Sequence, residues 1–487
     1  MTDSIPALRV TPLNVGSISR RGHYVLYWMI AARRTTWSFA LDHAIASSRS
    51  LGRPLVVFEA LRAGYPWASD RFHAFVLQGM ADNALAFAAA AVTYVPYVEP
   101  EPGRGAGLVE ALAKRACVVV TDEQPGFFLP RMIAAAAARI DVRVEQVDGN
   151  GIVPLRATDR AFVTAASFRR QLQKVIVPHL VARPAAEPLS DLPLVALGGE
   201  VPGRILGRWR SASLATDRDT LARLPIDHLV APVPYRGGAT TGAAVVDDFI
   251  TRKLARYADD RNDPDVDASS GLSPYLHFGH VSAHDVAARV WSAARWDVAR
   301  VVGARVTGSR AGWWGLPAGS EAFLDQLVTW RELGYGFCFH RRDYGRWSAL
   351  PAWARATLDA HASDHRPVLY SRSALEEART ADPIWNAAQR QLVADGRIQN
   401  YLRMLWGKKI LEWSRTPRAA LATMIELNNK YAVDGRDPNS YTGILWTLGL
   451  FDRAWGPVRP IFGTVRYMSS ASTARKLQLR NYLRRWS

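Results

Sequence analysis

Short apolar runs alternate with amphipathic segments along the first third of the chain. Five runs have the length and the β-branched or aromatic content of buried strands, and they cover residues 23–29, 54–60, 93–98, 117–122 and 142–148. The segments between them are rich in alanine and have helical periodicity, as in ADNALAFAAAA. Strands that alternate with helices of this length are typical of a doubly wound parallel sheet. Because no G-x-G-x-x-G follows the first run, the sequence does not predict a standard dinucleotide site there.

The pattern changes at two further points. It weakens between 161 and 245, where RPAAEPLSDLPLVALGGEVPGR is rich in proline and glycine, and this predicts a long linker. From 246 to 487 apolar residues recur at three- and four-residue spacing, as in FLDQLVTWRELGYGF, which predicts helices. We therefore expect a flexible arm over 1–21, a doubly wound parallel α/β domain over 22–160, a linker over 161–245 and an all-helical domain over 246–487.

The composition indicates which class of partner the protein binds and which cellular compartment it occupies. The formal net charge is +17 and the pI is near 10.1, which favours a polyanionic partner, nucleic acid ahead of an anionic membrane. A generally basic protein would show the same surplus. Cys117 and Cys338 are the two cysteines of the sequence, so it predicts neither a disulfide framework nor a thiolate metal site, and a reducing, cytoplasmic compartment is expected. The apolar run YVLYWMIAA is too short to span a bilayer.

Three tryptophans are candidate functional residues of the expected helical domain. Trp406 and Trp413 lie seven residues apart in RIQNYLRMLWGKKILEW, so they share one helix face about two turns, or ~10 Å, apart. Taken alone, such a pair more often packs a core than carries a function. Trp385, on a preceding helical segment, is placed to pack against them. Separately, the stretch SSGLSP offers hydroxyls and backbone N–H groups at a helix start, which suits either a pyrophosphate or plain helix capping.

Several longer motifs stand in order along the chain. They are YVLYWM, RNDP followed by LSPYLHFG, FLDQLVTWREL, DPIWNAAQ, LRMLWGKKILEW, LNNKYAVDGRDPNSYTGILW and RPIFGTVRYM. With them the chain resembles the photolyase and cryptochrome flavoproteins, specifically the class II photolyases that repair cyclobutane pyrimidine dimers. The resemblance implies a monomeric carbon–carbon lyase that binds FAD in its helical domain and acts on double-stranded DNA with blue light. It also implies a second, light-harvesting chromophore of deazaflavin type, for which the sequence contains no identifiable motif.

The resemblance also assigns roles to single positions. Electrons would reach the flavin through Trp413, Trp385 and Trp406, in that order from the surface inward. The flavin contacts would be Tyr257, Ser269, Ser270, Leu272, Ser273, Arg403, Asn428, Asp434 and Asp437, with Arg403 and Asp434 as an ion pair and Asn428 facing flavin N5. The dimer would lie between Trp330 and Trp446, beside Met404, with Arg466 supporting the opened duplex.

Two positions depart from the pattern of the resembled family. Gln326 stands where a glutamate hydrogen-bonds the damaged base, and Gln399 stands where class II sequences have a histidine. Glutamine keeps hydrogen-bonding capacity but loses the titratable group. With the flavin and tryptophan positions intact, these changes suggest an altered lesion pocket.

Three functions therefore stay open at this stage. The first is dimer repair, the second is a repair-inactive photoreceptor of cryptochrome type, and the third is a flavoenzyme that acts on a different substrate. Photoreduction without repair would favour the second, and tight, salt-sensitive DNA binding would argue against a small-molecule role. A yellow purified protein would exclude a structural or DNA-packaging protein without flavin.

Overall fold

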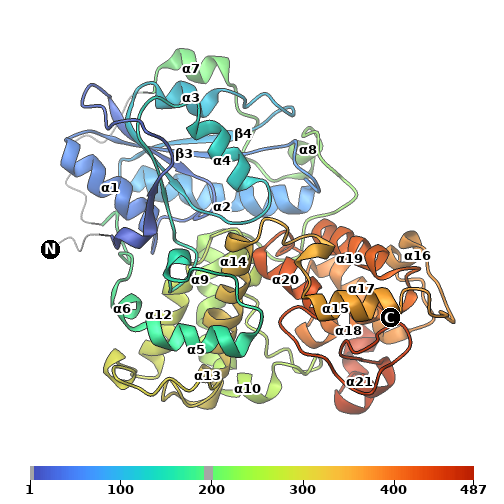
Figure 1. Cartoon of the computed structure of the whole chain (residues 1–487). Coiled ribbons are helices and arrows are strands. Elements are labelled where there is room, and N and C mark those ends of the chain that lie inside the picture. The colour runs from blue at the N-terminus through green and yellow to red at the C-terminus, as the bar shows by residue number, and fades with distance from the viewer. Residues whose placement is uncertain (1–4, 191–200) are drawn as a thin grey trace. The chain divides into compact units, whose positions relative to one another are not determined.

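The computed structural model describes residues 5–190 and 201–487, and the chain divides into two compact units (Figure 1). Unit 1 comprises Met1–Ala157, Val175–Asp247 and Leu272–Ala293. Unit 2 comprises Thr158–Lys174, Asp248–Gly271 and Ala294–Ser487. The expected fold class is confirmed, because an α/β sheet domain is followed by a helical part.

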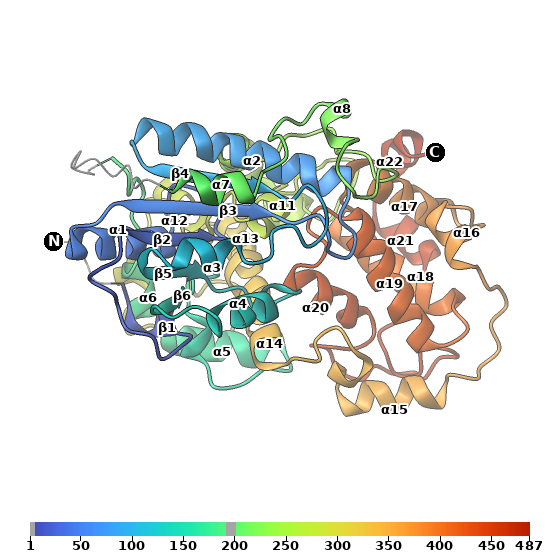
Figure 2. The same cartoon turned by 90° about the horizontal axis from the view of Figure 1, so that it is seen from above.

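Unit 1 is built on a six-stranded sheet in the order β1-β6-β5-β2-β3-β4, which Figure 2 shows from β4 to β1. The strands are β1 (Val10–Pro12), β2 (Tyr24–Met29), β3 (Leu55–Leu61), β4 (Thr93–Val98), β5 (Ala116–Asp122) and β6 (Val144–Val147). β2 to β6 pair in parallel, whereas β1 pairs with β6 in antiparallel fashion. All five predicted strands are confirmed.

The expectation of a flexible arm was wrong for residues 7–12. This segment forms a 3-10 turn (Ala7–Arg9) and then β1 at the edge of the sheet. The side chain of Arg9 is fully buried, and its guanidinium donates to the carbonyls of Asp148 at 3.0 Å and Ile152 at 2.7 Å. These partners lie about 140 positions away in the sequence, so no local pattern indicates them.

Apolar side chains cover both faces of the sheet. One core lies under α1 (Phe39–Leu51) and the end of α2 (Asp70–Ala89), and the other lies under α3 (Leu108–Ala113), α4 (Leu129–Ala137) and α7 (Gly203–Arg208). Figure 1 shows these two groups on opposite sides of the strands. Because a parallel sheet is buried on both faces, its strands are apolar throughout, as the six buried residues of β2 illustrate.

The chain reverses its winding direction between β2 and β5, where doubly wound folds bind nucleotides. Here the carboxylate of Asp122 accepts hydrogen bonds from the backbone N–H groups of Ile30, Ala31 and Ala32 at 2.7–2.9 Å. The hydroxyl of Tyr27 donates to the same carboxylate at 2.8 Å. The protein's own side chain thus fills the amide nest, in agreement with the missing glycine motif.

The described residues of the segment expected to be a linker form five helices. They are α5 (Ala165–Val175), α6 (Val177–Val181), α7, α8 (Arg218–Leu221) and α9 (Ala239–Asp248). The segment is divided between the units, since most of α5 belongs to unit 2 and residues 175–247 belong to unit 1. Part of the proline- and glycine-rich stretch, 191–200, lies outside the described residues. The helical domain expected from residue 246 is also divided, because α11 (Ser273–His277) and α12 (Ala283–Ala293) cluster with unit 1.

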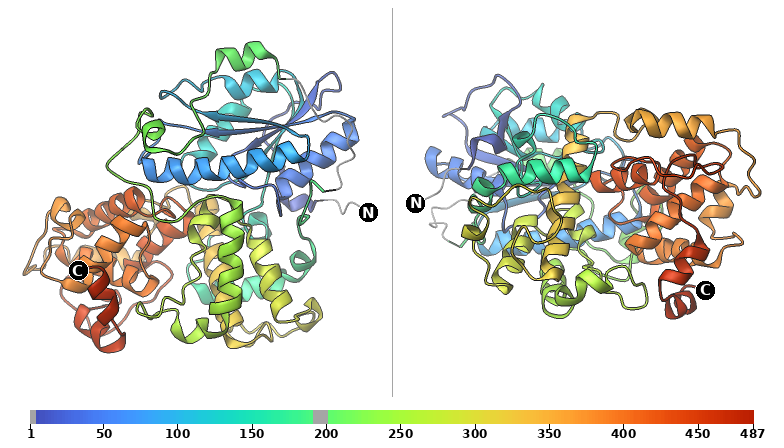
Figure 3. Two further views of the ribbon diagram at one scale, coloured as in Figure 1. Left: turned by 180° about the vertical axis from the view of Figure 1, so that it is seen from behind. Right: turned by 60° about the horizontal axis from the view of Figure 1, so that its bottom comes forward.

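The helices α15 to α22 of unit 2, orange to red in Figure 3, gather into one cluster. They are α15 (Ala352–Ala360), α16 (Arg372–Glu376), α17 (Pro383–Asp395), α18 (Asn400–Trp413), α19 (Pro417–Tyr431), α20 (Pro438–Thr447), α21 (Ser470–Lys476) and α22 (Arg480–Arg485). α18 packs against α17, α19 and α20. It approaches α20 so closely that a Cβ on Gly407 would lie 2.7 Å from Cγ2 of Thr447. α18 is therefore in contact with the helices that carry many of the other candidate residues.

Candidate functional site

α18 begins at a side-chain cap formed by Gln399. Oε1 of Gln399 accepts hydrogen bonds from the N–H groups of Tyr401 at 2.8 Å and Leu402 at 3.1 Å, while Nε2 donates to the carbonyl of Arg261 at 2.8 Å. This use of both amide atoms satisfies helix N–H groups that otherwise have no intrahelical partner. The geometry gives Gln399 a structural task, and Gln399 does not line the cavity described below.

The three tryptophans expected to carry electrons come together. The rings of Trp385 and Trp413 meet edge to face, with centroids 5.5 Å apart and planes at 75°. Nε1 of Trp385 donates to the carbonyl oxygen of Trp406 at 3.1 Å, and Nε1 of Trp406 donates to Oε1 of Gln389 at 2.8 Å. All three side chains are buried, and Trp413, the residue expected at the outer end of the row, is the most exposed at 7%, against 0% for Trp385 and 2% for Trp406.

A further oxidisable side chain adjoins this row and was missed in the sequence. The ring of Tyr370 lies 5.1 Å from that of Trp413 at 82°, and its backbone N–H donates to the Trp413 carbonyl at 3.3 Å. Tyr370 precedes α16 in a segment without regular structure. Its 43-residue separation from Trp413 leaves no periodicity that could reveal the contact.

The expected ion pair of Arg403 and Asp434 is present. The guanidinium of Arg403 on α18 donates to the carboxylate of Asp434 at 3.2 and 3.4 Å, and both side chains are partly buried. Asn428, at the end of α19, is buried, and its amide nitrogen donates to Oγ of Ser440 at 2.7 Å. Within the described part of the chain, Oδ1 of Asn428 accepts no hydrogen bond. This buried amide therefore retains one acceptor for a ligand.

Asp437 and Tyr257, two other expected flavin residues, have partners within unit 2. Asp437 caps α20 by accepting from the N–H of Asn439 at 2.8 Å, and it also accepts from the Tyr335 hydroxyl at 2.8 Å. Tyr257 is buried and meets Phe249 and Phe323 edge to face.

The serine stretch belongs to both units. Ser269 and Ser270 close a segment of unit 2, whereas Leu272 and Ser273 open a segment of unit 1. The Ser269 hydroxyl donates to Asp267 at 2.8 Å. Ser273 begins α11, which has only five residues, so little of the helix macrodipole expected for a pyrophosphate site is available here.

A cavity of about 770 Å³ lies in unit 2 beside α18. Its walls include Trp330, Met404, Trp446 and Arg466, which are four of the five residues expected to contact the substrate. They come from the end of a π-helical segment (Asp325–Trp330), from α18, from α20 and from the chain that follows α20. The sequence motifs that predicted a lesion pocket therefore meet in one place.

The cavity is strongly basic and aromatic. Five cationic side chains line it, Arg169, Arg453, Arg459, Arg466 and Lys476, together with the single carboxylate of Asp452. Arg466 is fixed by Asp452 at 2.8 and 3.1 Å and stacks on Trp455 at 3.9 Å. Trp455 was missed in the sequence, because a lone tryptophan in a loop has no distinguishing pattern. Such a lining suits an anionic ligand with flat rings.

Gln326 lies one turn before Trp330 in the π-helical segment. Its side chain is half-buried, and it makes no hydrogen bond to any residue that the structure describes. π-helical turns occur often at functional sites. Gln326 does not line the cavity itself, but its amide is free of partners among the described residues, in contrast to the amide of Gln399.

Lys408 is a buried cation that sequence reasoning missed, because a Lys-Lys pair on a helix reads as a solvated face. Its Nζ donates to the Thr447 carbonyl at 2.5 Å and lies 5.6 Å from the ring centroid of Trp446. Burial lowers the pKa of Lys408 to about 7, the Asp452 carboxylate acts to raise it, and Arg466 acts to lower it. The ring of Trp446, which forms part of the cavity wall, therefore lies near a titratable group.

Lys408→Met is expected to change how stability depends on pH. Above pH 7 native Lys408 loses its proton, whereas the unfolded side chain keeps it up to a pKa of about 10.4. Because the unfolded state then binds more protons, Lys408 makes wild-type stability rise with pH in this window, by up to about 1.4 kcal/mol per pH unit. Urea unfolding of both proteins at several pH values measures the difference. A difference that stays constant from neutral to alkaline pH would refute the assignment.

No helix among residues 5–190 and 201–487 is long and apolar enough to cross a membrane. The same residues hold no group of three or more histidine, cysteine or acidic side chains that could bind a metal ion.

Comparison with known proteins reveals relatives along the whole chain. A deoxyribodipyrimidine photo-lyase of Methanothermobacter thermautotrophicus is 33% identical over 486 residues, which is 99% of this chain and 98% of the relative. The photo-lyase of Oryza sativa is 34% identical over 98% of this chain and 89% of the relative, and that of Potorous tridactylus is 31% identical over 95% and 81%. No family model matches the sequence.

Solved structures agree in fold. A bacterial class III photolyase from Agrobacterium tumefaciens superposes with a TM-score of 0.67 at 18% identity, over 97% of this chain and 87% of that one. A Synechocystis cryptochrome superposes with a TM-score of 0.68 at 15% identity, over 95% and 88%. On full-length sequence identity and shared fold, the chain belongs to the photolyase and cryptochrome family.

Proposed function

We propose that the protein is a class II type photolyase that uses blue light and FAD to split cyclobutane pyrimidine dimers in double-stranded DNA. One observation carries the proposal: Trp330, Met404, Trp446 and Arg466 line a single cavity. α18 supplies Met404 to this cavity, Arg403 to the ion pair and Trp406 to the tryptophan row. A ligand in the cavity would thus share one helix with the residues proposed to serve the flavin.

The residues of unit 2 fit a flavin. Asn428 keeps a free acceptor on a buried amide, and an amide can both donate to and accept from a ring nitrogen. The partly buried ion pair of Arg403 and Asp434 supplies charges of both signs, which would tune the electronics of a ring system bound against it. Reduced FAD, when bound, would supply the electron that light transfers to the dimer.

The chain's own residues would hold and activate the substrate. A dimer must leave the duplex to reach a cavity of this kind. Trp330 and Trp446 would stack on its two bases, and Arg466, already oriented by Asp452 and Trp455, would contact the opened strand. The cationic lining would stabilise the negative charge that the dimer gains.

One observation favours a second candidate, a repair-inactive photoreceptor or a flavoenzyme with another substrate. The side chain at position 326 is a neutral amide that has no hydrogen-bond partner in the described structure. It can donate a hydrogen bond to a base but cannot transfer a proton from a carboxyl group. A protein that binds dimer-containing DNA and never splits it in light would have this second function.

Trp446→Ala is expected to weaken binding of dimer-containing DNA. Stacking on an aromatic side chain contributes about 1–3 kcal/mol per base, so the dissociation constant should rise about tenfold or more. Fluorescence anisotropy in the dark with a single-dimer duplex measures it. Trp486→Ala, at a tryptophan that does not line the cavity, is the control and should bind as wild type does. Equal affinities of the Trp446 variant and wild type would remove Trp446 from the substrate site.

A further inference from the structure

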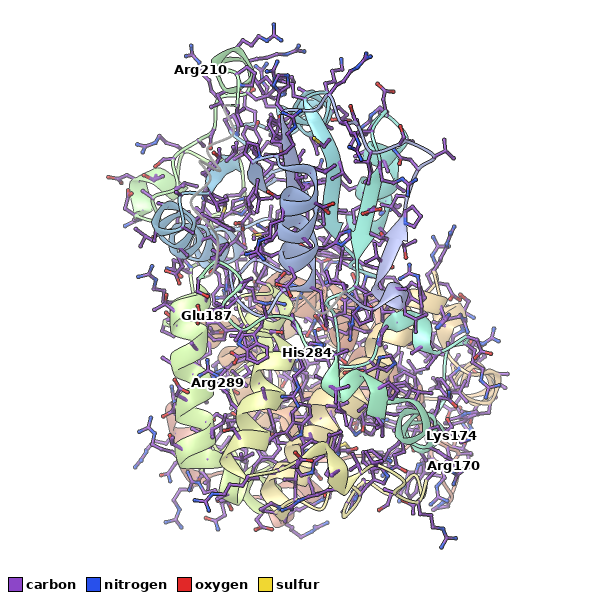
Figure 4. All side chains as sticks on the ribbon, turned by 90° about the vertical axis from the view of Figure 1, so that its left-hand side faces the viewer. Arg170, Lys174, Glu187, Arg210, His284 and Arg289 are labelled. Atoms are coloured by element: carbon purple, nitrogen blue, oxygen red, sulfur yellow. The ribbon has the colours of Figure 1, made fainter. Side chains whose placement is uncertain are left out.

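α5 contributes residues both to the cavity and to an exposed basic surface. Its first turn, with Thr164 just before it, lines the cavity, and Arg169 does so one turn later. Arg170 and Lys174 are exposed, and Figure 4 shows them side by side on the outside of the helix. The helix therefore presents one face to the substrate cavity and a cationic face to solvent.

The loop over residues 301–311 is held against the same helix. Oε1 of Gln173 accepts from the N–H groups of Thr307 at 3.1 Å and Gly308 at 2.7 Å, and its Nε2 donates to the Ser309 carbonyl at 3.2 Å. Arg169 adds a bond to the Gly308 carbonyl at 3.4 Å. These contacts give the loop a defined position relative to the cavity wall.

Gly308 is the point where the loop and Arg170 meet. A Cβ added there would lie 3.4 Å from Cβ and 3.5 Å from Nε of Arg170, and the backbone has a φ of +72° that favours glycine. Arg305 and Arg310 flank this contact, and both are exposed. The helix and the loop together form one surface, which we define as the basic strip: Arg170, Lys174, Arg305 and Arg310.

The charges of the basic strip are uncompensated. Within the described residues none of the four makes an ion pair or a side-chain hydrogen bond, whereas neighbouring Arg169 is paired with Asp325 at 2.9 Å. Four like charges held near one another repel in the absence of a partner. A polyanion with regularly spaced charges would relieve this repulsion.

We propose that the basic strip binds backbone phosphates of duplex DNA outside the cavity, beside the dimer and without reading sequence. The proposal rests on the proposed function for its DNA partner, and it names a surface that no residue of the cavity provides. Phosphate contacts of this kind position a protein on DNA and make its affinity depend on salt.

The test measures dark binding of undamaged duplexes at several salt concentrations. Two double variants neutralise the strip, Arg170→Gln with Lys174→Gln, and Arg305→Gln with Arg310→Gln. The control, Arg204→Gln with Arg210→Gln, removes two exposed charges of unit 1. Since each phosphate contact contributes about 0.9 to the slope of log affinity against log salt, each strip variant should lose about 2 on a duplex of about 30 base pairs. The control should keep the wild-type slope.

The outcomes separate this proposal from the one before it. The proposal is overturned if the control loses as much slope as the strip variants, or if the strip variants keep the wild-type slope. Thermal unfolding of all variants checks that they are folded. Dark binding to undamaged DNA does not depend on dimer splitting. The binding result can therefore be interpreted even if the protein fails to split dimers.

Discussion

Trp385→Phe is expected to abolish most of the light-driven reduction of bound FAD. Trp385 is fully buried, touches the ring of Trp413 with its own ring and donates a hydrogen bond to the backbone of Trp406. Phenylalanine fills most of the same space but is far harder to oxidise, so it would interrupt a row of side chains that carries electrons. Flavin absorbance under blue light with an external reductant measures the rate. The long-lived absorption of an oxidised tryptophan at the outer end of the row should disappear in parallel, because oxidised Trp406 could no longer be reduced through Trp385.

Trp486→Phe is the matched control for this prediction. It makes the same chemical change at a tryptophan outside the row, and it should reduce as fast as wild type. Affinity for dimer-containing DNA should be unchanged in both variants, because neither residue lines the cavity. Normal photoreduction in Trp385→Phe would show that electrons take a different path, and the roles proposed for Trp406 and Trp413 would fall with it.

Gln326→Glu is expected to raise the rate of dimer splitting, by about a hundredfold if the new carboxyl acts as a proton donor. The half-buried side chain at 326 has no partner in the described structure and lies one turn before Trp330. A glutamate there would add a titratable group one turn from Trp330, which lines the cavity, without disturbing an existing hydrogen bond. Counting split dimers per absorbed photon in wild type and variant measures the gain.

Gln399→His separates the two departures from the family pattern. Gln399 caps α18 through two backbone N–H groups and bonds Arg261. Losing such a cap costs about 1 kcal/mol of stability, and the splitting rate should hardly change. A gain in splitting from Gln399→His, with none from Gln326→Glu, would reverse the roles that the structure assigns to these glutamines.

Local patterns predicted elements whose determinants are local. The five parallel strands were readable because strands buried on both faces are apolar throughout, as in β2. β1 was not, since it depends on pairing with β6 and on the buried guanidinium of Arg9. The helices between 161 and 245 were hidden for a similar reason: prolines and glycines punctuate them, and packing against the two units determines where they form.

The residues of the candidate site were also predictable only where spacing or a motif identifies them. Spacing placed Trp406 and Trp413 on one helix, and motif resemblance proposed the cavity residues that the structure brings together. Tyr370, Trp455 and Lys408 were missed, because each is defined by a contact between segments distant in sequence. Gln399 was singled out in the sequence, but its role was not predictable. A departure from a motif does not reveal whether the new side chain faces a ligand or caps a helix.

Light-dependent splitting of a defined dimer tests the central claim most directly. The protein, reconstituted with FAD and fully reduced, would be mixed with a duplex that contains one cyclobutane pyrimidine dimer, and restored pyrimidines would be counted by chromatography. The account predicts splitting that requires blue light and that falls when Trp446 is replaced by alanine. Binding of the duplex with no splitting above the dark control, in wild type and in Gln326→Glu, would contradict it.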